Sequence, residues 1–239
     1  MPTSELLIPR QKSVIVAADV EAEKFSELVR GTCLVQGIGG YKVGFELGLE
    51  RGLPWVVDTV REQTDLPIIY DHQKAGNDIP ETGTNFARVC KKAGVNAVIL
   101  FPFTGPETEL RWIKEAQDAN LVVLVGGHMT HKGFLHNEGG SIAEDAPGKI
   151  YTIAAENGVK DFVVPGNKVE YVKKYRSLLE EILGEDGFTL YAPGFITQGG
   201  EITEFAKSAG KRWHAIVGSA IYRAVNIKEA AEQVTRPIR

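Results

Sequence analysis

Cysteine is scarce in this chain of 239 residues, which contains only Cys33 and Cys90. Two thiols in a chain of this size exclude a disulfide framework and favour a reducing compartment. No spacing of cysteine and histidine resembles a zinc site, and no apolar run approaches the roughly 18 residues that a membrane-spanning helix needs. Residues 1–11 lack a basic stretch followed by an apolar core, so they predict no signal peptide, and we expect a cytoplasmic protein.

An excess of basic charge is also lacking. The formal net charge is -4, which gives no footprint for nucleic acid but allows a local cationic pocket for a small anion. Apolar residues make up 43% and charged residues 24% of the chain, as in an ordinary soluble globular protein. Because the composition does not shift along the sequence, we predict a single domain over residues 1–239.

Short apolar runs alternate with amphipathic stretches along the whole chain. Continuous apolar character predicts strands buried on both faces, as in a parallel sheet. The predicted strands are residues 13–19, 40–45, 67–72, 97–102, 121–126, 161–165, 189–193 and 215–218. The predicted helices are residues 21–30, 55–63, 84–93, 106–119, 148–157, 168–183, 201–209 and 227–234. Glycines at their ends are typical helix stops, namely Gly31, Gly94, Gly158 and Gly210.

This alternation predicts an α/β fold, a single (β/α)8 TIM barrel, because eight βα units fill a chain of about this length. The rival is a doubly wound open sheet, which we disfavour because no Gly-x-Gly-x-x-Gly follows the first strand. In a barrel the chemistry lies at the carboxyl ends of the strands. The longest irregular stretch, residues 126–147, is typical of a functional lid.

Charged residues cluster where the third predicted strand ends. Asp71, Lys74 and Asp78 follow within eight residues, and Lys42 lies in the neighbouring apolar strand. Charged groups are rarely buried unless they are paired. A structural salt bridge, or a lysine reaching solvent from a sheet edge, is the alternative, but a closed barrel has no edge. The alternating lysines and aspartates therefore predict a site that keeps a lysine charged in a partly dry pocket.

Other strand ends add polar groups to the same rim. Asp19 ends the first strand, where it serves the site or caps the next helix. Gln198, Gly199 and Gly200 form either a simple turn or a phosphate site at the start of a helix, since this fold usually holds phosphate after strands 7 and 8. Gly218 adds a backbone N–H after the last strand. The histidines near this rim remain open as ligands, acid–base groups or scaffolding: His72, His128, His131 and His136.

Taken in order, these segments resemble the orotidine 5′-monophosphate decarboxylase family over nearly the whole chain. The resemblance rests on an ordered series rather than on one decisive motif. The matching segments are Ala18-Asp19, residues 41–44, the Asp71/Lys74/Asp78 cluster with Ile79-Pro80, residues 129–133, residues 164–166, residues 193–200 and residues 216–222.

The resemblance implies a cofactor-free and metal-free decarboxylase of pyrimidine biosynthesis, built as a homodimer of barrels, that converts orotidine monophosphate to uridine monophosphate. Lys74 would donate the proton to C6 of the pyrimidine, and Asp71 would face the substrate's carboxylate. Lys42 would contact ribose and brace Asp71, Asp19 would hold a ribose hydroxyl, and Asp78 would reach into the partner subunit's site.

By the same resemblance, Thr130 would take the place of a pyrimidine-contacting serine. Gln198 would lie on the loop that closes over the phosphate. The remaining substrate-binding residues would be Pro193, Gly199, Gly200, Gly218 and Ser219.

Two departures from the family pattern stand out. The cluster is one residue longer in each gap than Asp-x-Lys-x-x-Asp, so strict strand alternation would place His72, not Asp71, on the face of Lys74. A bulge or an early strand end would restore Asp71 to the pocket. The usual phosphate-binding arginine is replaced by Ser219, and Arg223 lies one helical turn later.

These departures leave two other functions open. One is a metal-dependent phosphosugar decarboxylase or aldolase on the same scaffold, with Glu46 and Asp71 as candidate metal ligands. The other is a paralogue that binds a nucleotide without turning it over.

Overall fold

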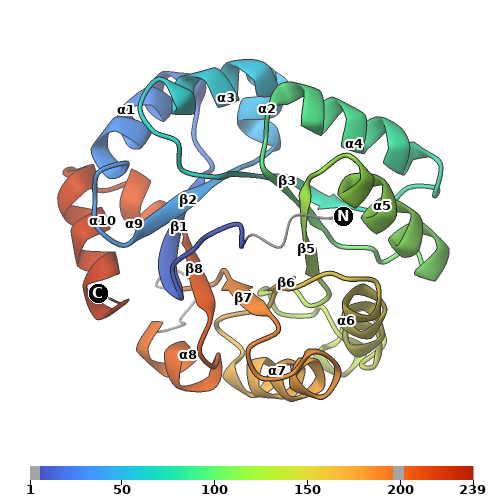
Figure 1. Cartoon of the computed structure of the whole chain (residues 1–239). Coiled ribbons are helices and arrows are strands. Elements are labelled where there is room, and N and C mark those ends of the chain that lie inside the picture. Colours follow the sequence, from blue (N-terminus) through green and yellow to red (C-terminus); the bar gives the residue numbers. More distant parts are fainter. Residues whose placement is uncertain (1–5, 196–201, 239) are drawn as a thin grey trace.

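The chain forms a closed barrel of parallel strands surrounded by helices (Figure 1). This computed structural model describes residues 6–195 and 202–238, except for the side chains of residues 73 and 74. The strands follow one another around the barrel in chain order, and β1 closes the ring by pairing with β8. The strands are β1 (Lys12–Ala18), β2 (Ile38–Val43), β3 (Ile68–Ala75), β4 (Ala97–Leu100), β5 (Val122–Gly126), β6 (Asp161–Val163), β7 (Thr189–Ala192) and β8 (Trp213–Val217).

The helices form the outer layer (Figure 1). They are α1 (Ala22–Thr32), α2 (Phe45–Glu50), α3 (Leu53–Arg61), α4 (Thr82–Ala93), α5 (Pro106–Asp118), α6 (Ala146–Glu156), α7 (Val169–Leu183), α8 (Ile202–Ser208), α9 (Ser219–Tyr222) and α10 (Ile227–Thr235), with the short 3-10 helices η1 (His136–Glu138) and η2 (Arg236–Ile238). The predicted TIM barrel is confirmed. The sequence did not predict α2 and α9, because each is too short to display helical periodicity. Within the described chain no helix combines the length and the apolar character needed to cross a membrane.

Three of the four predicted helix-stop glycines have a left-handed backbone. Gly94, Gly158 and Gly210 have φ values of 92°, 82° and 81°, a region in which glycine is favoured. The fourth prediction is wrong, because Gly31 lies inside α1. A Cβ atom at Gly31 would approach the side chain of Ile227 to 3.0 Å, so this glycine allows α1 and α10 to pack closely.

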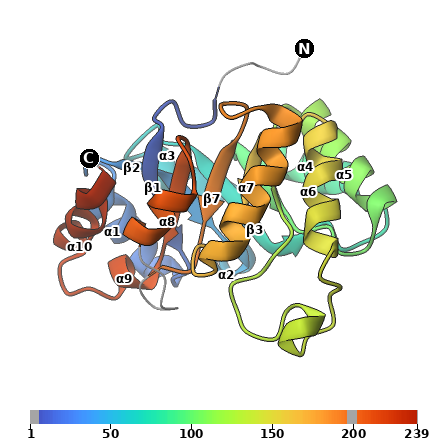
Figure 2. The same cartoon turned by 90° about the horizontal axis from the view of Figure 1, so that it is seen from below.

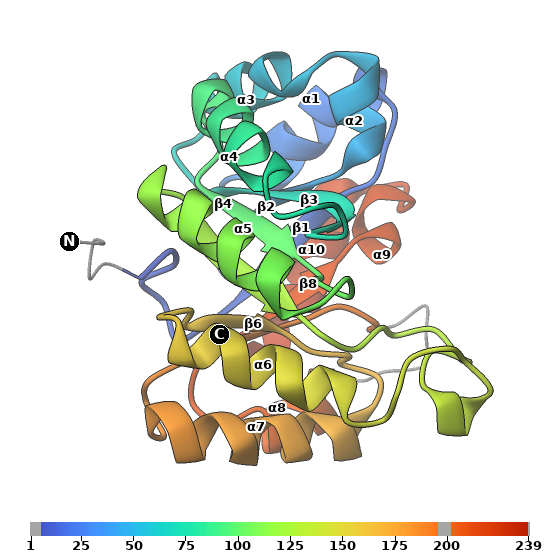
Figure 3. The same ribbon diagram turned by 90° about the vertical axis from the view of Figure 1, so that its right-hand side faces the viewer.

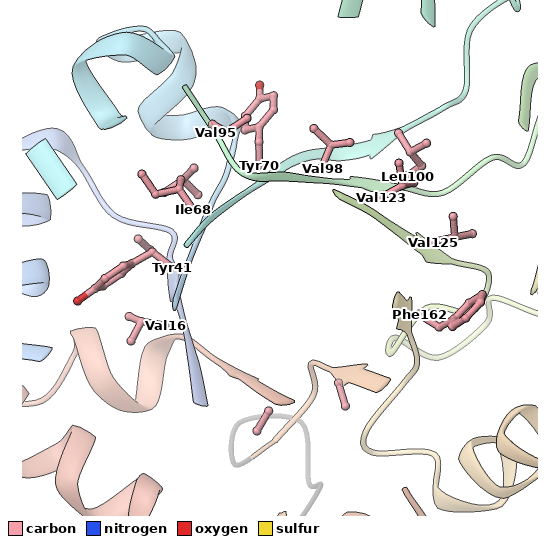
Figure 4. Packing of buried hydrophobic residues seen from close by; sticks show 14 of the residues in the cluster. Val16, Tyr41, Ile68, Tyr70, Val95, Val98, Leu100, Val123, Val125 and Phe162 are labelled. Atoms are coloured by element: carbon pink, nitrogen blue, oxygen red, sulfur yellow. The ribbon is translucent and has the colours of Figure 1, made fainter. Parts of the chain in front are cut away.

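Both faces of the sheet are buried, which explains the continuous apolar runs in the sequence. On β1, Val14 and Val16 pack in the outer cluster under the helices, whereas Ile15 packs inside the barrel. Figure 4 shows part of the outer layer, where side chains such as Tyr41 and Val98 point from the strands toward the helices. Interior residues from six of the strands fill the barrel: Ile15, Ile69, Ile99, Leu124, Tyr191 and Ile216.

The two ends of the barrel are built differently. At one end the segment before β1 covers the interior, and Ile8 is buried among the interior side chains. At the opposite end, the connection between β5 and α6 carries η1 and projects beyond the helices (Figures 2 and 3). This second end is formed by the carboxyl ends of the strands, where the sequence predicts the site.

Candidate active site

A cavity of about 330 Å³ opens at the carboxyl ends of the strands. Its walls also contain apolar side chains such as Ile99, Phe101 and Ile216. Predicted site residues from six different strand ends meet in it, and these are Asp19, Lys42, Asp71, Thr130, Pro193, Gly218 and Ser219. The predicted barrel requires this convergence of strand ends on one cavity.

Lys42 lies at the centre of the charged wall. Its neighbours in β2, Tyr41 and Val43, pack outward, so strand alternation turns Lys42 inward. Its Nζ lies 3.1 Å from Asp19 Oδ1 and 3.4 Å from Asp71 Oδ2. Burial alone would lower the pKa of Lys42, but attraction to Asp71 and then to Asp19 outweighs burial and raises the pKa above its usual value. Lys42 therefore stays a cation, and the alternative of a lysine that reaches solvent from a sheet edge is wrong.

Asp71 faces the cavity with one oxygen unused. Ile69 points inward and Tyr70 outward, so regular alternation turns Asp71 inward. Its Oδ2 faces Lys42, whereas Oδ1 is buried and has no hydrogen-bond partner among the described residues. A buried carboxylate oxygen without a partner is costly.

A large bulge follows Asp71. Tyr70 pairs with Val98 and Ala75 with Leu100, so residues 71–74 of β3 lie opposite the single residue Ile99 of β4. This bulge absorbs the longer spacing of the charged cluster. Lys74 lies at the end of the bulge, but its side chain falls outside the described part of the structure.

His72 does not take the place of the acid. It is exposed, its Nδ1 is hydrogen-bonded to the Tyr70 hydroxyl, and its ring lies 6.4 Å from that of Phe86 on α4. Both partners belong to the outer side of the sheet, so His72 continues the alternation outward. The bulge that the sequence left as one option is present, and it begins after Asp71 rather than before it.

Asp78 does not join the cavity of its own chain. It is exposed in the loop between β3 and α4, where its Oδ1 accepts a hydrogen bond of 2.7 Å from the Ile79 N–H. Its carbonyl accepts a hydrogen bond of 2.9 Å from Thr108 Oγ1, which fixes the loop against α5. The side chain thus lies outside the cavity that Lys42 and Asp71 line, and it is accessible to another molecule.

The expected phosphate side is only partly described. Gly218 and Ser219 line the cavity, while Gln198, Gly199 and Gly200 lie outside the described residues. Arg223 does not fold back to replace the missing arginine. It lies over the Tyr222 ring, 5.9 Å from the centroid, and lines a neighbouring groove together with Lys24.

The sequence did not reveal a network of polar side chains that begins at His128, close to Thr130 in the chain. His128 lines the cavity and is hydrogen-bonded to Lys168, which in turn pairs with Glu138. His128 was one of several ambiguous histidines, and no spacing signal connects residues 128, 138 and 168. Only the fold brings them together.

The described residues offer no obvious metal centre. No group of three or more histidine, cysteine, aspartate or glutamate side chains among them could hold a metal ion. Glu46 lines the groove beside Asp19, whereas Asp71 lines the central cavity. The two candidate ligands of the phosphosugar alternative therefore do not share a pocket.

Comparison with known proteins identifies the family. The profile of the orotidine 5′-phosphate decarboxylase / HUMPS family matches residues 12–234. The chain belongs to this family. Among curated members, orotidine 5′-phosphate decarboxylase from Methanosarcina mazei is 34% identical over 235 residues, covering 96% of both chains. The enzyme from Methanosphaera stadtmanae is 28% identical and covers 96% of this chain and 98% of its own.

Solved structures of family members have the same fold. Orotidine 5′-phosphate decarboxylase from Pyrococcus horikoshii superimposes with a TM-score of 0.76 and 26% identity, over 95% of this chain and 99% of that one. The enzyme from Methanocaldococcus jannaschii in complex with the inhibitor BMP gives a TM-score of 0.80 at 24% identity, over 95% of this chain and 98% of that one. The longer charged cluster and the serine at position 219 are therefore variations within the family.

Proposed function

We propose that this protein decarboxylates orotidine 5′-monophosphate to uridine 5′-monophosphate without a cofactor, as a step of cytoplasmic pyrimidine biosynthesis. The observation that carries the proposal is the buried Lys42–Asp71 pair in the wall of the cavity. Curated relatives with this activity match the chain over almost its full length. The barrel is taken as one domain that carries the whole reaction.

The charges of the cavity suit loss of carbon dioxide. Departure of CO2 leaves an electron pair on C6 of the pyrimidine, and the ring cannot delocalise it. A lysine ammonium next to that carbon stabilises the developing carbanion and then supplies the proton. Lys74 is assigned this role from its place in the charged cluster. Asp71, fixed by Lys42, opposes the substrate carboxylate and favours its departure.

The other cavity residues are assigned to binding. Asp19 and Lys42 face the ribose, and Thr130 contacts the base. The phosphate is assigned to Pro193, Gly218 and Ser219, together with Gln198, Gly199 and Gly200, which lie outside the described residues. Backbone N–H groups and the Ser219 hydroxyl take over from the missing arginine, so phosphate is bound with fewer charge-assisted contacts.

A homodimer with shared sites is also proposed. Asp78 is exposed, lies outside the cavity of its own chain, and sits beside Ile79, which is 60% exposed. An acidic and an apolar side chain on a loop held against α5 suit insertion into a second copy. In the dimer, Asp78 hydrogen-bonds the ribose in the partner's cavity.

The loss of ultraviolet absorbance on mixing chelator-treated protein with orotidine 5′-monophosphate tests the activity. Turnover to uridine 5′-monophosphate, identified by chromatography, is expected without added metal. Activity that appears only after Mg²⁺ is restored, or on a phosphosugar instead, would favour the metal-dependent alternative. Tight nucleotide binding without turnover would favour a non-catalytic paralogue.

A further inference from the structure

A chain of polar side chains links the cavity wall to the long connection between β5 and α6, residues 127–145, which we call the excursion. His128, which is 1% exposed, lines the cavity. Its Nε2 lies 3.0 Å from Lys168 Nζ, and Lys168 Nζ lies 2.7 and 2.9 Å from the two carboxylate oxygens of Glu138. Glu138 belongs to η1 at the tip of the excursion, whereas Lys168 directly precedes α7. Two segments distant in sequence are thereby tied together beside His128.

The protonation of this network follows from its partners. A lysine ammonium only donates hydrogen bonds, so Nε2 of His128 must accept, and the ring proton resides on Nδ1. Nδ1 then donates to the Tyr175 hydroxyl at 2.7 Å. Burial, and next the charge of Lys168, lower the pKa of His128 to about 4. At neutral pH the imidazole is therefore a fixed, uncharged connector and not a proton donor to substrate.

The same contacts fix the backbone of the excursion. The Glu138 carboxylate accepts hydrogen bonds of 3.3 and 3.5 Å from the Phe134 and Leu135 N–H groups. The Phe134 ring stacks on His128 with a centroid distance of 5.4 Å and an interplanar angle of 22°. The excursion thus folds around one ion pair and one buried ring.

Thr130 lies within this held segment. Its carbonyl accepts a hydrogen bond of 3.1 Å from Asn167 Nδ2, and Asn167 immediately precedes Lys168. Gly194 fits between the two, since a Cβ atom there would lie 3.0 Å from the Thr130 methyl and 3.1 Å from Asn167 Oδ1. The segment between β6 and α7 therefore holds both the tip of the excursion and the residue assigned to the base.

We propose that Lys168 is a positioning residue that latches η1 to His128 and so fixes Thr130 at the cavity. The latch favours a closed excursion before the substrate arrives, so less ordering is needed on binding. This role rests on the proposed function only in the assignment of Thr130 to the pyrimidine. A purely structural ion pair would affect unfolding but not the affinity for nucleotide.

The test compares Lys168→Met with Lys168→Arg and with Lys149→Met. Lys149 pairs with Asp145 close to the same excursion, and both side chains are largely exposed, which makes it a matched control. We expect Lys168→Met to lower kcat/KM roughly 10- to 100-fold, mainly through KM, because small displacements of positioning groups have effects of this size. Lys168→Arg should recover most of the loss, and Lys149→Met should stay within about twofold of the wild type.

Trypsin cleavage after Lys132, an exposed residue of the excursion, gives a readout that is independent of turnover. The latch predicts faster cleavage at this bond in Lys168→Met than in Lys149→Met. If the wild type fails to turn over orotidine 5′-monophosphate, the proposed function is wrong. The comparison of cleavage rates between Lys168→Met and Lys149→Met still tests whether Lys168 holds the excursion.

Equal cleavage and a kcat/KM within about twofold of the control, in folded Lys168→Met, would overturn the latch. A lower melting temperature with normal kinetics and normal cleavage in the folded fraction would overturn it as well, because only a structural ion pair would then remain. If Lys168→Met does not fold, Glu138→Gln carries the test, because it removes the charge and preserves the shape.

Discussion

The two ends of the barrel bury basic side chains equally well and treat their charge in opposite ways. We call the carboxyl ends of the strands the mouth of the barrel. There Lys42 is 6% exposed and keeps its proton because Asp71 and Asp19 lie within 3.4 Å. We call the amino ends of the strands the base of the barrel. There His214 is 1% exposed, and burial together with repulsion from Arg212 lowers its pKa to about 3. Its Nδ1 is hydrogen-bonded to the neutral Ser13 hydroxyl at 2.7 Å.

This contrast shows that the two carboxylates beside Lys42 outweigh its burial, whereas burial prevails at His214. The base has its own carboxyl, Asp161, but burial raises the pKa of that group to about 7, and its hydrogen bond to Tyr191 only partly opposes this. At the amino ends of the strands the buried histidine is neutral, and Asp161 ionises only near pH 7. A charged mouth can oppose a carboxylate and stabilise a carbanion, so the chemistry is confined to that end.

Removal of the proposed proton donor should have the largest effect. Lys74→Ala is expected to lower decarboxylation by at least about 10²- to 10⁴-fold, the usual contribution of a general acid. Binding of uridine 5′-monophosphate should stay within about tenfold, because the proton is needed only after CO2 departs. The steady-state rate and nucleotide affinity check this. Lys12→Ala, at the amino end of β1, is the control and should leave the rate unchanged. Retained turnover in Lys74→Ala would refute the assignment of Lys74 as the proton donor.

Replacing one carboxylate at each end by an amide should have different effects on stability at the two ends. Asp71→Asn leaves Lys42 with only the half-exposed Asp19, so we expect a loss of about 1–3 kcal/mol in the free energy of unfolding at pH 6 and a large loss of turnover. Asp161→Asn should cost less at pH 6, because Asp161 is already mostly neutral there. Denaturant titration of both variants gives the comparison, and equal losses would contradict the account.

Lowering the pH should reduce the stability of the folded protein, because His214 is buried as a neutral ring at the amino ends of the strands. The unfolded chain binds a proton at His214 near its usual pKa of 6.5, but the folded protein does so only near pH 3. The stability due to the neutral ring is therefore complete above pH 6.5 and is lost as the pH falls below it. Between pH 7 and 5 the wild type should lose on the order of 2 kcal/mol relative to His214→Gln, which cannot be protonated. Parallel stability curves over this range would show that His214 titrates normally.

The mouth, unlike the base, is expected to be completed by a second copy of the chain. Equal amounts of Lys74→Ala and Asp78→Ala should form mixed dimers with one intact site each. Random association makes about half of the dimers mixed, so about a quarter of the wild-type rate should return. Each variant alone serves as the control. Absence of recovery, with subunit exchange verified by differently tagged chains, would refute the shared site.

The sequence was sufficient for the fold and for most of the mouth. Parallel-strand patterning predicted the barrel, and the rule that chemistry lies at strand ends brought Lys42, Asp71 and Thr130 into one cavity. The assignment of Asp71 over His72 could not be made, because it depends on where the bulge in β3 begins. That position is set by the contacts of His72 with Tyr70 and Phe86 on the outer side, which only the packed structure contains.

Long-range pairs were equally inaccessible to sequence reasoning. His128, Glu138 and Lys168 have no diagnostic spacing, and their contact depends on how the excursion folds back onto α7. The same limit applies to Arg223. Its distance of one helical turn from Ser219 suggested a return to the phosphate, but it lies over Tyr222 in a different groove.

The ionisation of Lys42 tests the comparison between the two ends most directly. In protein labelled with ¹³C at the lysine Cε, the Lys42 signal can be assigned by its absence from Lys42→Met. The account predicts that this signal titrates above the usual value of 10.5 in the wild type and at a lower pH in Asp71→Asn. A wild-type midpoint below 10.5 would mean that burial outweighs the two carboxylates, and the claim that counter-charges keep the mouth ionised would be wrong.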